Sequence, residues 1–157
     1  MKLLACFVFA LSLVSSLSAE TLKIPADKPF ASVTFPEDWS AEVKGDTITA
    51  KNEDEDVLID VIVTRPDMLG PSNDKAFALL KVKPDFDSFK ENKSTINGLP
   101  ANVVTVDAKG DSGTVKLTLT SLEVTKEKGL MFIQRGEGLA GNQEAVTAIL
   151  NSVKAEK

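Results

Sequence analysis

The most regular alternation of apolar and polar residues lies between Asn97 and Arg135, and it predicts three successive strands. Side chains on a strand point alternately to opposite faces, so a period of two indicates a strand buried on one side. The pair Asn97-Gly98 favours a tight turn before the first strand, because glycine adopts positive φ without a side-chain clash. The predicted strands are 101–106, 115–120 and 130–133, separated by turns at 109–113 and 126–129.

The phase of this alternation changes within the second predicted strand. Apolar residues occupy every second position up to Leu119, and the next apolar residues are Leu122 and Val124. An extra residue in one strand shifts the phase in this way, so we expect a β-bulge near Ser121.

The chain before residue 64 predicts further strands. Residues 20–28 contain Pro25, which cannot donate to a sheet ladder, so we expect an edge strand or an extended arm there. The segment 57–63 is apolar on both faces, which is typical of a central strand covered on both sides. The remaining predicted strands are 30–35, with Ala31, Val33 and Phe35 on one face, 39–44 and 47–50.

Two helices are predicted from apolar residues with helical spacing. Ser72 or Asn73 would cap the first helix and Pro84 would end it, whereas 86–96 fits either a helix or a strand. The second helix, 142–154, should pack back onto the three strands described first. We therefore predict an α+β fold in which helices pack on an antiparallel sheet. The apolar stripes are Ala76, Phe77, Leu79 and Leu80 in the first helix and Val146, Ile149, Leu150 and Val153 in the second.

The first nineteen residues are typical of a secretory signal peptide. Lys2 precedes an apolar run over 3–14, and small residues lead to an expected cleavage site after Ala19. Cys6 is not expected to carry a lipid, because no apolar segment precedes it. The exported chain would then be a single domain over 20–157 without a membrane anchor.

The composition of the exported chain excludes several classes of function. The 157-residue sequence has no histidine or tyrosine, and its one cysteine lies in the predicted leader. Disulfides, common zinc or haem sites, and catalysis by histidine or cysteine are therefore excluded. Without Lys2 the chain has 17 basic and 23 acidic residues, a net charge of −6, which disfavours nucleic acid and anionic membranes as partners. We expect no metal and no cofactor.

An acidic run, Glu53-Asp54-Glu55-Asp56, is a candidate calcium site because Ca²⁺ prefers several oxygen ligands. The run lacks the glycine and the distal glutamate of helix-loop-helix calcium sites. We favour its interpretation as a solvated turn between two strands.

Asp60 lies within the most apolar predicted strand. A buried carboxylate at this place would serve as a general acid if a second carboxylate lay beside it. An isolated buried charge is costly, so we expect instead a lysine, an arginine or backbone amides next to Asp60.

Arg65 and Arg135 are the two arginines, and each follows an apolar strand. Together they would form a clamp for a carboxylate or phosphate group. Arginines at strand ends are usually solvated, and we favour that interpretation for both.

Two further features have both a functional and a structural interpretation. Trp39 is a candidate binding anchor, although a tryptophan at the start of a strand more often fills the core. Asn92-Lys93-Ser94 is a glycosylation sequon, which has meaning only in a eukaryotic secretory pathway.

The order of predicted elements is four strands, a helix, three strands and a helix, and four short segments mark it. With these markers the chain resembles the PsbP-like fold family, which includes the extrinsic subunit of photosystem II, a yeast Ran-binding protein and small bacterial envelope proteins. The resemblance implies a central antiparallel sheet between helices and a non-enzymatic accessory or binding role. Histidines for the metal contacts of photosynthetic members are missing, which argues against a photosynthetic role. The markers are Phe35-Pro36-Glu37-Asp38-Trp39, Gly98-Leu99-Pro100-Ala101, Gly129-Leu130 and 148–153.

These observations lead us to expect an exported, non-catalytic accessory or binding protein of a bacterial periplasm, or one that is secreted. Its partner would be a protein or another envelope component, and the sequence assigns no catalytic or ligand-binding residue. The alternatives are a small-ligand carrier with a pocket between sheet and helix, and a carboxylate-dependent hydrolase. A pocket with convergent polar groups would favour the carrier or the enzyme, and its absence would favour a protein that acts through surface contacts.

Overall fold

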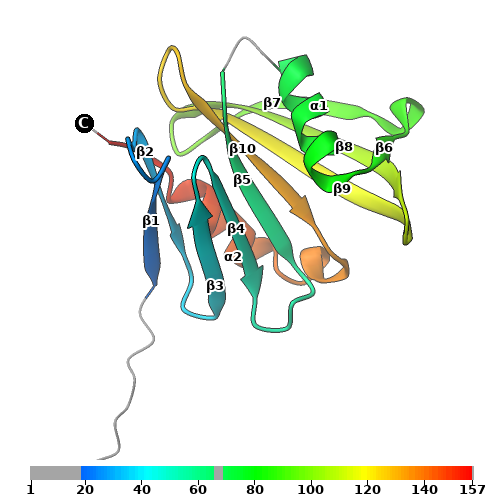
Figure 1. Ribbon diagram of the computed structural model, residues 1–157, viewed down its shortest axis with the longest axis horizontal. Coiled ribbons are helices and arrows are strands. Elements are labelled where there is room, and N and C mark those ends of the chain that lie inside the picture. Colours follow the sequence, from blue (N-terminus) through cyan, green and yellow to red (C-terminus); the bar gives the residue numbers. More distant parts are fainter. Residues whose placement is uncertain (1–18, 66–68, 157) are drawn as a thin grey trace, which may run out of the picture.

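The computed structural model describes residues 19–65 and 69–156, which form two antiparallel sheets and two α-helices (Figure 1). The smaller sheet has the order β1-β2-β11, and the larger has the order β3-β4-β5-β10-β9-β8-β6, with β7 also paired to β8. The predicted α+β class with an antiparallel sheet is confirmed. The small sheet consists of β1 (Glu20–Ile24), β2 (Ala31–Phe35) and β11 (Lys154–Ala155). The large sheet consists of β3 (Trp39–Lys44), β4 (Thr47–Asn52), β5 (Leu58–Thr64), β6 (Lys83–Pro84), β7 (Lys90–Ile96), β8 (Leu99–Gly110), β9 (Gly113–Glu123) and β10 (Gly129–Arg135).

Two hydrophobic cores lie on opposite faces of the large sheet. On one face, the small sheet and α2 (Gln143–Asn151) cover residues such as Val61 and Phe132. On the other face, α1 (Leu69–Leu80) covers residues such as Ile62 and Met131 (Figure 1). Neighbouring residues of β5 and β10 therefore enter different cores, which confirms that β5 is a central strand covered on both sides.

The predicted bulge near Ser121 is wrong. The pairing of β9 with β8 and with β10 runs without an inserted residue through this position. Leu117 and Leu119 enter the core under α1, whereas Leu122 and Val124 enter the core under α2. The phase shift in the sequence marks the point where β9 passes from one core to the other, and this requires no change in register.

The boundaries of both helices differ from the prediction. Helix α1 begins at Leu69, so the expected cap at Ser72 or Asn73 is wrong. Pro71 lies in the first turn of this helix, where proline is tolerated because its missing N–H would have no intrahelical partner. Helix α2 ends at Asn151, before Lys154, because the chain then turns to pair β11 with β2.

The segment left open between helix and strand contains both a short 3-10 helix and a strand. The 3-10 helix covers Phe86–Ser88, and the side chain of Asp85 caps it by accepting a hydrogen bond from the Asp87 amide at 3.2 Å. Strand β7 follows and pairs with β8 along its whole length. A second 3-10 helix, Glu137–Ala140, precedes α2.

The N-terminal prediction is confirmed only in part. Strand β1 is an edge strand of the small sheet, as expected for a segment that ends near Pro25. The predicted leader lies outside the described residues except for Ala19. Among the helices that the structure describes, none has the length and apolar character required to span a membrane.

Candidate functional site

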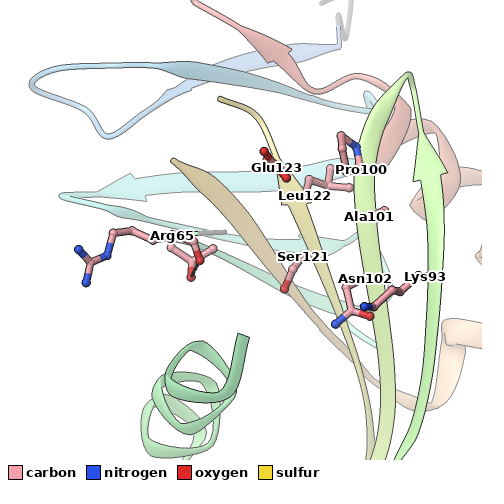
Figure 2. Close-up of a pocket in the computed structure, with 9 residues that line it drawn as sticks. Arg65, Lys93, Pro100, Ala101, Asn102, Ser121, Leu122 and Glu123 are labelled. Atoms are coloured by element: carbon pink, nitrogen blue, oxygen red, sulfur yellow. Dashed lines mark hydrogen bonds between the residues drawn. The ribbon is translucent and has the colours of Figure 1, made fainter. Parts of the chain in front are cut away.

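A cavity of about 190 Å³ lies on the face of the large sheet that also carries α1 (Figure 2). It is more enclosed than the larger hollows beside Trp39, Phe86 and Leu79. Strands β7, β8 and β9 form one wall, and the end of β5 with the residue after it forms the other. The lining residues are Thr64, Arg65, Lys93, Pro100, Ala101, Asn102, Ser121, Leu122 and Glu123.

A row of polar side chains crosses the sheet at the base of the cavity. Lys93 on β7 pairs with Asn102 on β8, and Asn102 pairs with Ser121 on β9. Directly opposed residues of antiparallel strands place their side chains on the same face, with Cβ atoms about 4.5–5.5 Å apart. The register therefore brings an ammonium, a carboxamide and a hydroxyl group together, and Figure 2 shows Lys93 reaching toward Asn102.

The next row explains why the sheet is hollow here. Glu123 on β9 and Thr64 on β5 both pair with Gly129 on β10. Glycine has no side chain, so the row has a gap between Glu123 and Thr64. A Cβ atom at Gly129 would lie 2.6 Å from the carbonyl oxygen of Leu122, so close packing of the backbone excludes a larger residue.

Asn102 carries an unsatisfied acceptor. The residue is 9% exposed, and its Oδ1 atom has no hydrogen-bond partner among the described residues. Leaving a buried polar atom unpaired costs about 1–3 kcal/mol. On the opposite face the comparable buried amide of Gln134 is satisfied, because Nε2 donates to Thr120 Oγ1 at 2.8 Å. The side chain of Asn102 therefore has an unused capacity to bind a donor.

Charged groups of both signs border the cavity. Lys93 is exposed and Glu123 is half-buried, and no ion pair within residues 19–65 and 69–156 includes either. The guanidinium group of Arg65 points away from the cavity (Figure 2). Lys93 therefore provides a positive charge next to Asn102, and Glu123 provides a negative charge one row away.

Asp60 has the partner that its burial required. It is 5% exposed, and its carboxylate pairs with the guanidinium group of Arg135 on β10. Thr49 on β4 donates to Asp60 Oδ1 at 3.0 Å. The expectation of a cationic neighbour is confirmed, and the interpretation of Arg135 as a solvated flank is wrong because this arginine satisfies a buried carboxylate.

The proposed clamp of two arginines does not form. Arg135 pairs with Leu58 at the start of β5, and Arg65 follows the last residue of the same strand. Seven residues of strand at about 3.3 Å each separate the two ends by roughly 20 Å. Arg65 borders the cavity described above, whereas Arg135 borders the hollow beside Leu79.

The acidic run forms an exposed turn between β4 and β5. Lys51 Nζ pairs with Glu55 at 2.5 Å, and Asn52 Nδ2 donates to Asp56 Oδ1 at 2.6 Å. Asn52 also accepts the Val57 amide at 2.9 Å, so the turn is held by its own side chains. In the part of the chain that the structure describes, no group of three or more acidic side chains is placed to hold a metal ion.

Trp39 is a core residue, as we favoured. It is 6% exposed and belongs to the core under α2, although its Nε1 atom has no hydrogen-bond partner among the described residues. Asn92 is exposed on β7, and its glycosylation stays a prediction.

Similar solved structures share the architecture that carries this cavity. Cyanobacterial PsbP (CyanoP) from Synechocystis has a TM-score of 0.58 and 11% sequence identity, over 95% of this chain and 99% of that one. LpqN of Mycobacterium tuberculosis, a protein involved in cell envelope biogenesis, has a TM-score of 0.53 and 12% identity, over 88% and 92%. The fold is PsbP-like.

A protein from Bacteroides thetaiotaomicron is also similar to the PsbP-like chain, with a TM-score of 0.56 and 12% identity over 82% of it. The chain spans about half, 46%, of that protein's length. No protein-family model matches the sequence, and no curated protein matches it. At 11–12% identity the likeness to solved structures shows the fold alone.

The sequence of this PsbP-like chain contains a signal for the cavity in its two neighbouring strands β8 and β9. Asn102 occupies the same face of its strand as Val104 and Val106, where an apolar residue is expected. Ser121 likewise follows Leu117 and Leu119 at alternate positions. Polar residues at core positions of two neighbouring strands predict a polar recess if the strands are correctly paired.

Proposed function

We propose that the chain is a non-catalytic binding protein of a bacterial envelope, and that its cavity receives one small polar group of a partner. The predicted leader supports a location in the periplasm or outside the cell. The PsbP-like fold supports an accessory role, since LpqN, which shares it, is involved in cell envelope biogenesis.

The unsatisfied Oδ1 atom of Asn102 carries this proposal. Proteins seldom keep a buried acceptor without a partner, and such exceptions need an explanation. A donor that arrives with a binding partner supplies that explanation. Lys93 and Ser121 flank Asn102 in the same row, so three polar groups lie side by side at the base of the cavity.

The size of the cavity favours a group of a larger partner over a free carried molecule. Sites for small molecules usually enclose about 300–1,000 Å³, whereas this cavity measures about 190 Å³. A carrier function is therefore less well supported. Hydrolysis by paired carboxylates has no support at Asp60, because the described contacts of its carboxylate are Arg135 and Thr49.

Site-specific crosslinking in native envelopes tests the proposal. A photo-crosslinking residue is placed at position 95, which pairs with the lining residue Pro100, or at position 90, which lies on the same strand but on the opposite face. We expect a defined crosslinked partner from position 95 that is lost when Asn102→Leu is added. Equal crosslinking from position 90, or no effect of Asn102→Leu, would contradict the proposal.

A further inference from the structure

We infer that the group received by the cavity is the C-terminal residue of a peptide chain, with a small apolar side chain. This inference rests on the proposed function and names the chemistry of the partner at the same site.

Asn102 and Lys93 together match the two polar groups of a terminal residue. Asn102 Oδ1 needs a donor, and the backbone N–H of the terminal residue is one. Lys93 is a cation without an ion-pair partner among the described residues, and the terminal carboxylate is an anion bonded to the same Cα. The separation of opposed side chains, about 4.5–5.5 Å between Cβ atoms, suits two groups joined through one carbon atom.

Ser121 offers a further donor to the bound residue. It lies opposite Asn102 on β9, in the same row as Lys93 but on the other side of Asn102. A carboxylate accepts several hydrogen bonds, and bonds to a charged group are about twice as strong as neutral ones. Capture of a C-terminal carboxylate is a recurring mode of peptide recognition.

The remaining lining restricts the side chain of that residue. Pro100, on the same face of β8 as Asn102, is apolar, so an apolar side chain is favoured over a charged one. The volume of about 190 Å³ limits it to a small residue such as alanine or valine. Glu123, one row away, would repel a second carboxylate, so an acidic residue just before the terminal one is disfavoured.

Titration with short peptides tests the inference. The full chain is expressed, purified in its processed form and labelled with ¹⁵N, and acetyl-Gly-Gly-Ala with a free carboxylate is added. Its matched control is the same peptide with a C-terminal amide. We expect the acid to bind at least about tenfold more tightly than the amide, since a charge-assisted hydrogen bond is worth about 1.5–3 kcal/mol, and to shift the amide signals of Asn102 and Ser121.

Two variants separate the site from nonspecific attraction. Lys93→Ala should weaken binding of the acid by at least about tenfold, whereas Lys90→Ala, on the other face of the same strand, should not. Equal binding of acid and amide, or no binding of either, would overturn the inference. Tight binding of free alanine would overturn it too, since that would indicate an amino-acid zwitterion held by Lys93 and Glu123.

The crosslinking experiment distinguishes a wrong ligand class from a wrong site. If the peptide fails but position 95 still crosslinks to a partner in an Asn102-dependent manner, the binding function stands and the proposed ligand, a C-terminal residue, is refuted. If both experiments fail, the cavity is not a binding site.

Discussion

Asp60 on β5 and Arg135 on β10 form an ion pair on the face of the sheet that carries α1, and Thr49 supplies a second hydrogen bond to the same carboxylate. The pair lies near the start of β5, whereas the cavity lies at the end of that strand. Its contribution to stability can therefore be measured without changing a residue that lines the cavity.

Asp60→Asn should destabilise the protein by about 1–3 kcal/mol, because the neutral amide no longer balances the charge of Arg135. Urea unfolding measures this, with Asp46→Asn as the matched control. Asp46 pairs with Lys75 at 3.4 Å, and both side chains are exposed, so its loss should cost no more than about 1 kcal/mol. Crosslinking from position 95 should persist in Asp60→Asn, and its loss in a folded variant would make Asp60 a functional residue.

Asn102→Leu should raise the free energy of unfolding by about 1–3 kcal/mol while abolishing binding, because it removes a buried acceptor that has no partner. The comparison is Gln134→Leu, which removes the hydrogen bond to Thr120 and should destabilise. Thermal unfolding of both variants measures the two changes in stability. A less stable Asn102→Leu would show that the side chain is satisfied in the free protein.

Gly136→Ala should destabilise the protein more than Gly45→Ala. Gly136 has φ +126°, and a Cβ atom there would lie 1.9 Å from the carbonyl oxygen of Asp56. Gly45 has φ +61° with open space around it, so alanine there suffers only the left-handed penalty of about 1–2 kcal/mol. If Gly136→Ala and Gly45→Ala lower the denaturant midpoint by the same amount, the loop before α2 does not pack against the turn at Asp56.

Ile149→Ala should cost about 2–5 kcal/mol, the usual range for truncating a buried aliphatic side chain, because Ile149 is fully buried in the core under α2. Leu150 is half-buried, so Leu150→Ala should cost less. If chemical denaturation gives the reverse order, the helix is rotated from the orientation described above.

Glu156 provides a pH-dependent contact at the end of the chain. Hydrogen bonds from Lys23 and Ser32 lower the pKa of Glu156 below its ordinary value of 4.5. A lowered folded-state pKa means that the stabilisation is complete above about pH 4.5 and is lost as the pH falls through the lower, folded-state value. The protection of the Lys154 and Ala155 amides, measured relative to their intrinsic exchange rates, should therefore fall in acid, and Glu156→Gln should remove this dependence.

The strands of the meander were predictable because a period of two is a strong local signal, and the partner of Asp60 was predictable because an unpaired buried charge is costly. The identity of that partner was not, since Asp60 and Arg135 are distant in sequence and meet only through the pairing of β5 with β10. The cavity could not be predicted for the same reason, because it also depends on which strands pair. Asn102 and Ser121 gain their meaning from register, which depends on how separate segments align in space.

The two ends of the described chain belong to the same small sheet. Strand β2 pairs with β1 on one side and with β11 on the other, and the Glu156 amide donates to Phe30 at 2.8 Å. One edge of β2 thus stays unpaired until residues 154–155 reach it. Residues near the two ends of the described chain must therefore meet before the small sheet is complete, so this sheet depends on contacts of very long sequence separation.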